Sequence, residues 1–136
     1  MPLRIAVLLS GSGTTLQNIL DRAEKKLLDA EVVCVVASRA DAFGLERAKK
    51  AGIHAVAIPR KEFDTSDAFG DAVWTEIRRH EPGLVVLAGF MSLLPIPPDF
   101  KNRIMNVHPA LIPSFSGKGM YGHHVHEAVL ASGVKG

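Results

Sequence analysis

Leu3-Arg4-Ile5-Ala6-Val7-Leu8-Leu9 runs directly into Ser10-Gly11-Ser12-Gly13-Thr14-Thr15-Leu16, and this junction sets the expected class of fold. The apolar run is too short to cross a membrane and no signal-peptide cleavage pattern follows it, so it predicts a buried first strand. The glycine-rich turn then leads into apolar residues at helical spacing over Leu16–Leu28. A buried strand joined to a helix by a short turn is typical of an α/β protein.

The rest of the chain repeats this alternation. Further strands are predicted at Glu31–Ala37, His54–Ile58, Leu84–Leu87 and Ile104–His108. Helices are predicted at Ala42–Ala51, at Ser66–His80 with Ser66 or Asp67 as the cap, at Phe100–Arg103 as the end of a short helix, and at His124–Ala131. Continuous apolar strands between helices indicate an α/β fold with a doubly wound, mainly parallel sheet and helices on both faces. Such sheets bind ligands at the carboxyl ends of their strands.

Composition is that of one compact domain. The chain has 136 residues, of which 47% are hydrophobic, enough for a substantial core. Its formal net charge of +2 comes without long runs of like charge, so neither a nucleic-acid arm nor an acidic tail is indicated. The single cysteine, Cys34, lies in an apolar run and is expected to be a small buried hydrophobe, which fits a reducing cytoplasm. The alternation ends on a helix, so either the fold closes there or a C-terminal part is absent.

The turn after the first strand is a candidate anion site. Its glycines allow close backbone approach, and the N–H groups at the start of a helix favour an anion. Hydroxyl groups from Ser12, Thr14 and Thr15 add donors. The turn matches neither a Walker A loop nor the full dinucleotide fingerprint, and an ordinary strand–helix turn with a hydroxyl cap is the alternative.

A second candidate segment, Ala88–Pro95, is apolar where a surface loop should be polar. A flat aromatic ligand could rest on it, and packing against the following helix is the alternative.

The third candidate is the pair Asn106 and His108. In an extended strand these side chains point to the same face, so an amide donor and a titratable imidazole could meet one carbonyl oxygen that gains negative charge. Pro109 and Pro113 restrict the backbone beside them. A structural or exposed histidine is the alternative.

Other polar residues are interpreted as less specific. His123, His124 and His126 lack cysteine partners and the spacing of a zinc helix, so no metal is expected. The scattered cations are read as solvated faces and not as a nucleic-acid groove; they are Arg60, Lys61, Arg78, Arg79 and Lys101.

These motifs coincide with one known family. Over Ser10–Gln17, Asp41–Ala48, Val86–Met91 and Asn106–Pro113 the chain resembles the phosphoribosylglycinamide formyltransferases, the folate-dependent transformylases of purine synthesis. The resemblance implies a Rossmann-like catalytic domain over residues 1–136 that lacks its C-terminal part. It implies transfer of the formyl group of 10-formyltetrahydrofolate to the amine of glycinamide ribonucleotide without a metal. We further expect a cytoplasmic monomer or homodimer that needs neither nucleic acid nor membrane.

The resemblance also implies roles for individual residues. His108 would be the general acid, and Asn106 would bind the formyl oxygen and contact the folate. The substrate phosphate would be held by Gly11, Ser12, Gly13, Thr14 and Thr15. The folate would be flanked by Ser66, Phe90, Met91, Ser92, Leu93 and Leu94.

The chain departs from the family at several positions. Many members carry arginine in place of Ser92 and often in place of Ser66, and asparagine is common in place of Thr15. The family also has, beyond the position of Gly136, an aspartate that raises the pKa of the catalytic histidine, so the 136-residue chain is expected to have little activity.

Three alternatives are weighed, of which methionyl-tRNA formyltransferase is set aside. A formyltetrahydrofolate deformylase would use water as the acceptor, but it tends to have histidine where this chain has Pro109. Methionyl-tRNA formyltransferase shares the Asn106–Pro109 segment but needs a different first loop and a tRNA-binding domain. A truncated, non-catalytic module that binds a nucleotide or folate is the alternative from another class.

Overall fold

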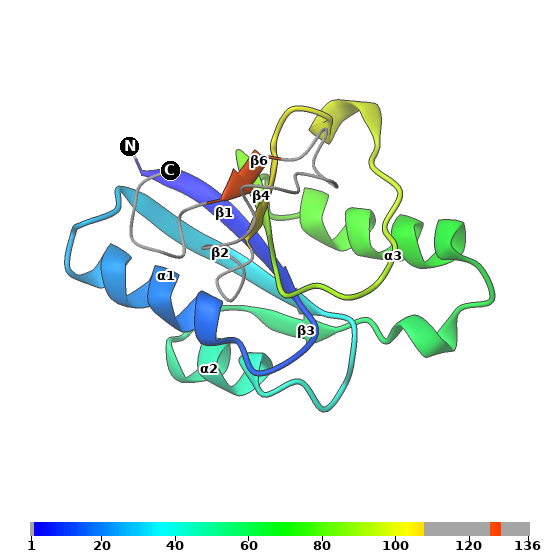
Figure 1. The fold of residues 1–136 in the computed structure, drawn as a ribbon, viewed down its shortest axis with the longest axis horizontal. Coiled ribbons are helices and arrows are strands. Elements are labelled where there is room, and N and C mark those ends of the chain that lie inside the picture. The colour runs from blue at the N-terminus through cyan, green and yellow to red at the C-terminus, as the bar shows by residue number, and fades with distance from the viewer. Residues whose placement is uncertain (1, 108–125, 129–136) are drawn as a thin grey trace.

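A six-stranded sheet with helices on both faces organises the chain, as seen in a computed structural model that describes residues 2–107 and 126–128 (Figure 1). The strands are β1 (Leu3–Leu9), β2 (Ala30–Ala37), β3 (Ala55–Ala57), β4 (Leu84–Ala88), β5 (Ile104–Val107) and β6 (His126–Ala128). The helices are α1 (Thr14–Glu24), α2 (Gly44–Lys50) and α3 (Ser66–Arg78), with short 3₁₀ turns η1 (Arg60–Glu62) and η2 (Pro98–Phe100). All neighbouring strands are parallel, in the order β3-β2-β1-β4-β5-β6. The predicted doubly wound α/β fold is confirmed.

The sheet is buried between two layers of helices. Val7 of β1 packs with Leu16 and Leu45, which come from α1 and α2. The next residue, Leu8, faces the other way and packs with Phe69 of α3. Because both faces of the central strands are covered, those strands must be apolar throughout, and each large side chain buried there contributes about 1.5–3 kcal/mol.

Helix α1 ends earlier than predicted. Lys26 adopts a left-handed conformation, with φ of 62°, and breaks the helix. Its N–H donates to the carbonyl of Ala23 while the N–H of Leu27 donates to that of Arg22, which is the hydrogen-bond pattern of a Schellman turn. The helical spacing continues to Leu28 but the helix does not, and Leu27 is exposed.

The start of α3 also differs in detail. Thr65, in extended conformation, is the cap, and its hydroxyl accepts the N–H of Ala68 at 3.0 Å. The prediction of Ser66 or Asp67 as the cap is therefore wrong by one or two residues, because both already have helical geometry. Similarly, the short helix expected to end at Phe100–Arg103 is η2, which ends at Phe100.

The prediction of a helix over His124–Ala131 is wrong at its centre. Residues 126–128 form β6, parallel to β5, with Asn106 opposite Glu127. The outer edge of β5 has backbone groups that need hydrogen-bond partners. In a short segment of mixed polarity, only such a tertiary contact decides between a strand and a helix. The other residues of that range lie outside the described part of the chain.

Cys34 is a buried, unpaired residue of β2, as predicted. Burial, reinforced by the carboxylate of Glu76, raises its pKa to about 12, so the thiol is inert at neutral pH.

Among residues 2–107 and 126–128, no helix has the length and apolar character needed to span a bilayer.

Candidate active site

The strand order places a crevice beside β1 and β4. After β1 the chain continues on the face of the sheet that α1 and α2 cover. In the loop after β4, by contrast, Phe90 and Leu94 pack into the core on the opposite face, which α3 covers. Loops that diverge from adjacent parallel strands open a binding crevice at the carboxyl ends of those strands.

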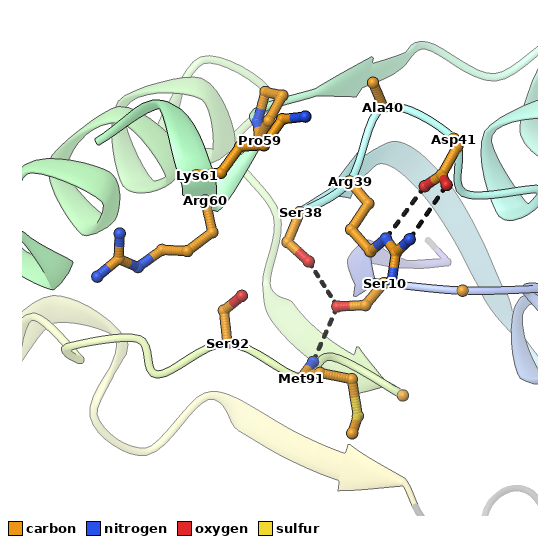
Figure 2. Close-up of a pocket in the computed structure, with 12 residues that line it drawn as sticks. Ser10, Ser38, Arg39, Ala40, Asp41, Pro59, Arg60, Lys61, Met91 and Ser92 are labelled. Carbon is orange, nitrogen blue, oxygen red and sulfur yellow. Dashed lines mark hydrogen bonds and ion pairs between the residues drawn. The ribbon is translucent and has the colours of Figure 1, made fainter. Parts of the chain in front are cut away.

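Ser10 ties the loops at this crevice together (Figure 2). Its N–H donates to the carbonyl of Gly89 at 3.2 Å, and its hydroxyl accepts the N–H of Met91 at 2.8 Å. The same hydroxyl lies 2.5 Å from that of Ser38, at the end of β2. Ser10 and Ser38 are both buried. The predicted phosphate turn and the predicted folate segment are thus joined by hydrogen bonds through Ser10.

The first turn presents backbone donors. Gly13, the N-cap residue of α1, has φ of 79° and no side chain with which to cap the helix, which begins at Thr14. The N–H groups of the first helical turn therefore remain able to bind an anion. Ser12 and Thr14 are exposed, but Thr15 is buried, so the hydroxyl predicted there points away from solvent.

Helix α2 holds this turn in shape from the side. The N–H of Gly44 donates to the carbonyl of Gly11 at 3.0 Å, and Arg47 Nε donates to the carbonyl of Ser12 at 2.7 Å. The guanidinium of Arg47 also lies over the ring of Phe43, 5.1 Å from its centroid. Gly44 and Arg47 therefore act on the site indirectly, by fixing the backbone of the first turn.

A cavity of about 820 Å³ opens beside Ser10. Residues that follow β1, β2, β3 and β4 line it, among them the predicted site residues Met91 and Ser92 (Figure 2). Gly11, also predicted, lines it as well. Its charged groups are Arg39, Asp41, Arg60 and Lys61.

The cavity has an excess of positive charge. Arg39 pairs with Asp41 through two hydrogen bonds of 3.1 Å, which lower the pKa of that carboxyl. Arg60 Nη1 donates to the carbonyl of Phe63 at 2.9 Å, and Lys61 acts on Asp41 only as a minor electrostatic influence. An anionic ligand is therefore favoured, and Arg60, interpreted from sequence as part of a solvated face, is half-buried at the cavity wall.

Sequence reasoning missed Ser10, Ser38, Arg39 and Asp41 as lining residues. The signal was available, because each follows a predicted strand at its carboxyl end, where a doubly wound sheet binds ligands.

The segment after β4 divides into two sets. Phe90 stacks on Phe69 with 6.1 Å between ring centroids, and Leu94 packs against the same core. Met91 and Leu93 are 83% and 75% exposed, so they form the apolar surface that a flat ligand could cover. Phe90 and Leu94 therefore pack into the core, against the preceding helix α3 and not the following one as the alternative had it, and ligand binding at Met91 and Leu93 stays a prediction. Ser66, the first residue of α3, is not among the residues lining the cavity.

Asn106 lies near the carboxyl end of β5, level with the other site elements. It is opposite Leu87 of β4, which in turn is opposite Leu8 of β1, two residues before Ser10. By strand alternation it shares the face of Ile104, which is the α3 face where Phe90 and Leu94 pack. His108, His123 and His124 lie outside the described residues, so the predicted convergence of Asn106 and His108 stays a prediction.

Comparison with known proteins agrees with this arrangement. Residues 3–136 match the formyl transferase family. Phosphoribosylglycinamide formyltransferase of Escherichia coli is 37% identical over 133 residues, which cover 96% of this chain and 60% of that protein. The Haemophilus influenzae enzyme of the same name is 38% identical over 120 residues, covering 87% and 57%.

Solved structures show the same fold. Glycinamide ribonucleotide transformylase 1 from Symbiobacterium toebii superposes with a TM-score of 0.76 at 42% identity, over 84% of this chain and 55% of that one. Phosphoribosylglycinamide formyltransferase from Brucella melitensis gives a TM-score of 0.77 at 32% identity, over 89% and 64%. The chain spans little more than half the length of these relatives. The strand order, the position of the site at the carboxyl ends of the strands and the match along nearly the whole chain all agree. The chain therefore belongs to the formyl transferase family.

Proposed function

We propose that the chain transfers the formyl group of 10-formyltetrahydrofolate to the amine of glycinamide ribonucleotide, in purine synthesis. The observation that carries this proposal is the pair of hydrogen bonds made by Ser10 with Gly89 and Met91. They place a turn suited to a phosphate next to an apolar segment suited to a pterin, which are the two recognition elements that such a reaction needs.

The phosphate of the ribonucleotide binds the backbone N–H groups at the start of α1, where the helix dipole and the Gly11–Thr15 turn favour an anion. The pterin of the folate rests on Met91 and Leu93. This arrangement brings the amine of one substrate and the formyl carbon of the other to the carboxyl ends of β4 and β5.

The amine nitrogen attacks the formyl carbon and forms a tetrahedral intermediate with a negative oxygen. Asn106 donates to that oxygen, and protonated His108 stabilises it. The bond between the formyl carbon and the folate nitrogen then breaks, and the proton lost by the amine reaches that nitrogen through His108. No metal takes part in this sequence.

The positive charge of the cavity compensates for the serine at position 92, where many relatives carry arginine. A folate carries carboxylates on its glutamate tail, and Arg60 and Lys61 line the same cavity as Ser92. They supply the positive charge that an arginine at position 92 supplies in many relatives. The partners proposed are these small molecules alone, for a cytoplasmic monomer or homodimer.

Two measurements test the proposal. Calorimetry with glycinamide ribonucleotide alone tests the phosphate turn, with Gly13→Ala as the variant expected to lose binding. A formyl-transfer assay tests the chemistry, and His108→Ala should abolish whatever turnover the protein shows. Binding without turnover would favour the non-catalytic module, and formate release without ribonucleotide would favour the deformylase.

A further inference from the structure

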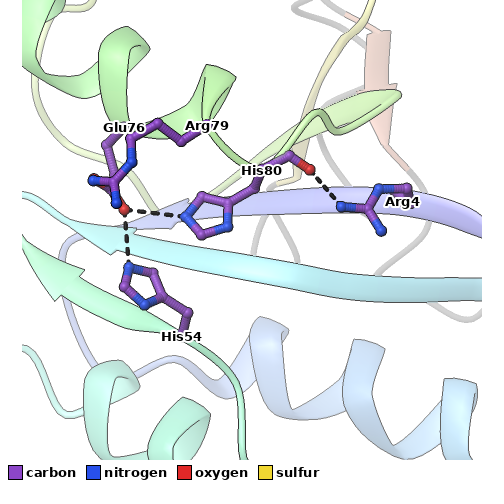
Figure 3. A network of polar contacts seen from close by, with 5 residues as sticks. All are labelled: Arg4, His54, Glu76, Arg79 and His80. Atoms are coloured by element: carbon purple, nitrogen blue, oxygen red, sulfur yellow. Dashed lines mark hydrogen bonds and ion pairs between the residues drawn. The ribbon is translucent and has the colours of Figure 1, made fainter.

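Two histidines and a glutamate meet at the end of the sheet opposite the candidate active site (Figure 3). His54 comes directly before β3, Glu76 lies in the last turn of α3, and His80 follows that helix. Both imidazoles approach the same carboxylate oxygen: His54 Nε2 lies 2.9 Å and His80 Nε2 lies 3.1 Å from Glu76 Oε2. Neither the family match nor the proposed reaction assigns any role to this cluster.

The spacing suits a small metal ion. The ligand atoms of the three side chains all lie within 4.8 Å of one another. In a tetrahedral site with bonds of about 2.0–2.2 Å, ligand atoms are separated by roughly 3.3–3.6 Å. Small rotations of the side chains would therefore open the cluster around an ion, without movement of the backbone.

The carboxylate of Glu76 is prepared for this role. Arg79 Nη1 holds the other oxygen, Oε1, at 2.9 Å, so Oε2 is turned towards the imidazoles, as outer-shell partners do in metal sites.

The backbone around the cluster is fixed as well. Arg4, from the start of β1, donates from Nη2 to the carbonyl of His80 at 2.5 Å and from Nε to that of Glu81 at 3.3 Å. These bonds hold the end of α3 against the sheet and position His80.

One side of the cluster remains accessible. His54 and His80 line a cavity of about 620 Å³, which gives an ion a path to the site and room for a water ligand. The side chains of Glu76 and His80 are 12% and 21% exposed, and that of His54 is 45% exposed. Partial burial of this kind strengthens the electrostatic attraction for a cation without closing the site.

We propose that His54, Glu76 and His80 bind one divalent transition-metal ion, specifically Zn²⁺, with water completing the coordination. Two neutral imidazoles and a carboxylate are the ligand set of open zinc sites. The ion replaces the protons through which the histidines contact Glu76, so its binding releases protons and weakens at acid pH. It joins the end of α3 to the start of β3 and stabilises the fold, at a distance from the formyl-transfer site.

Titration of the untagged protein with Zn²⁺ in a calorimeter, and with Co²⁺ by visible absorption, tests the proposal. One ion per chain should bind, the cobalt protein should show the intense bands of tetrahedral coordination, and Zn²⁺ should raise the melting temperature. His54→Ala, at the most exposed ligand, should keep the fold and weaken zinc binding at least about tenfold, the scale of metal-site perturbations. Glu76→Gln should do the same, and if it unfolds, His54→Ala decides.

The matched control is His123→Ala combined with His124→Ala, which removes two histidines that are not among the proposed ligands. This variant should bind Zn²⁺ like the wild type. If it loses the ion while His54→Ala keeps it, or if the wild type neither binds Zn²⁺ nor gains thermal stability from it, the proposal is wrong. Ribonucleotide binding should be the same in wild type and His54→Ala, so the result is independent of the proposed formyl transfer.

Discussion

Gly13 and Gly44 are in backbone contact: a Cβ built on Gly13 would lie 2.5 Å from the Cα of Gly44. Gly13 is the residue from which α1 starts and Gly44 is the first residue of α2. The two helices can therefore begin side by side only because Gly13 has no side chain. This contact sets the shape of the turn proposed to hold the substrate phosphate.

Gly13→Ala should destabilise the protein and abolish ribonucleotide binding. The left-handed φ of 79° costs about 1–2 kcal/mol for alanine, and the clash with Gly44 adds about 1–3 kcal/mol. Urea denaturation measures the loss. Gly52→Ala is the matched control, because Gly52 has φ of 76° but open space around it, so only the backbone strain should appear. Equal losses in the two variants would mean that the α1–α2 contact relaxes without cost.

Ser10→Ala should loosen the link between the two loops. The substitution leaves the N–H of Met91 and the hydroxyl of Ser38 without the partner they share, and a buried unsatisfied group costs about 1–3 kcal/mol. Ser38→Ala should cost less, because the bond between Ser10 and Met91 survives. Comparison of the two variants by denaturation, and of their folate affinities, checks the order. A larger effect from Ser38→Ala would contradict the central position given to Ser10.

Much of this fold could be predicted from sequence because its strands are buried on both faces. Runs such as Leu3–Leu9 are then apolar throughout, and Gly13 marks the turn that follows. The end of α1 could not be predicted in the same way. A lysine at position 26 adopts the left-handed conformation that is usual for glycine, so the residue type did not indicate that the helix ends there.

The candidate site could be predicted only where a single segment of the chain carries a recognisable sequence pattern. The Gly11–Thr15 turn has its own chemistry, and its neighbour Ala88–Pro95 is unusually apolar for a loop. Arg60 and Ser38 are common residue types that gain meaning only when the strand order brings their loops to one cavity. The cluster of His54, Glu76 and His80 likewise depends on a tertiary contact between α3 and the chain before β3.

Arg60→Gln should weaken binding of 10-formyltetrahydrofolate. A charge-assisted hydrogen bond contributes about 1.5–3 kcal/mol, so the dissociation constant should rise about tenfold or more. Ribonucleotide affinity should change little, because the phosphate turn is a separate element. Arg78→Gln is the control: Arg78 is an exposed arginine that pairs with Asp99 on the surface, and it does not line the cavity. An unchanged folate affinity in Arg60→Gln would remove Arg60 from the binding site.

Glu76 should make stability depend on pH. Its pKa is lower in the folded protein than the usual 4.5, so the folded state binds its proton less readily than the unfolded state. The stabilisation is therefore fully present above pH 4.5 and is lost as the pH falls through the lower, folded-state pKa. Wild-type stability should decline across this acid range more steeply than that of Glu76→Gln, measured by urea denaturation in metal-free buffer.

Glu62→Gln, at an exposed position on η1, makes the same change in net charge and should follow the wild-type curve. Parallel curves for wild type and Glu76→Gln would mean that the two histidines and Arg79 do not stabilise the carboxylate.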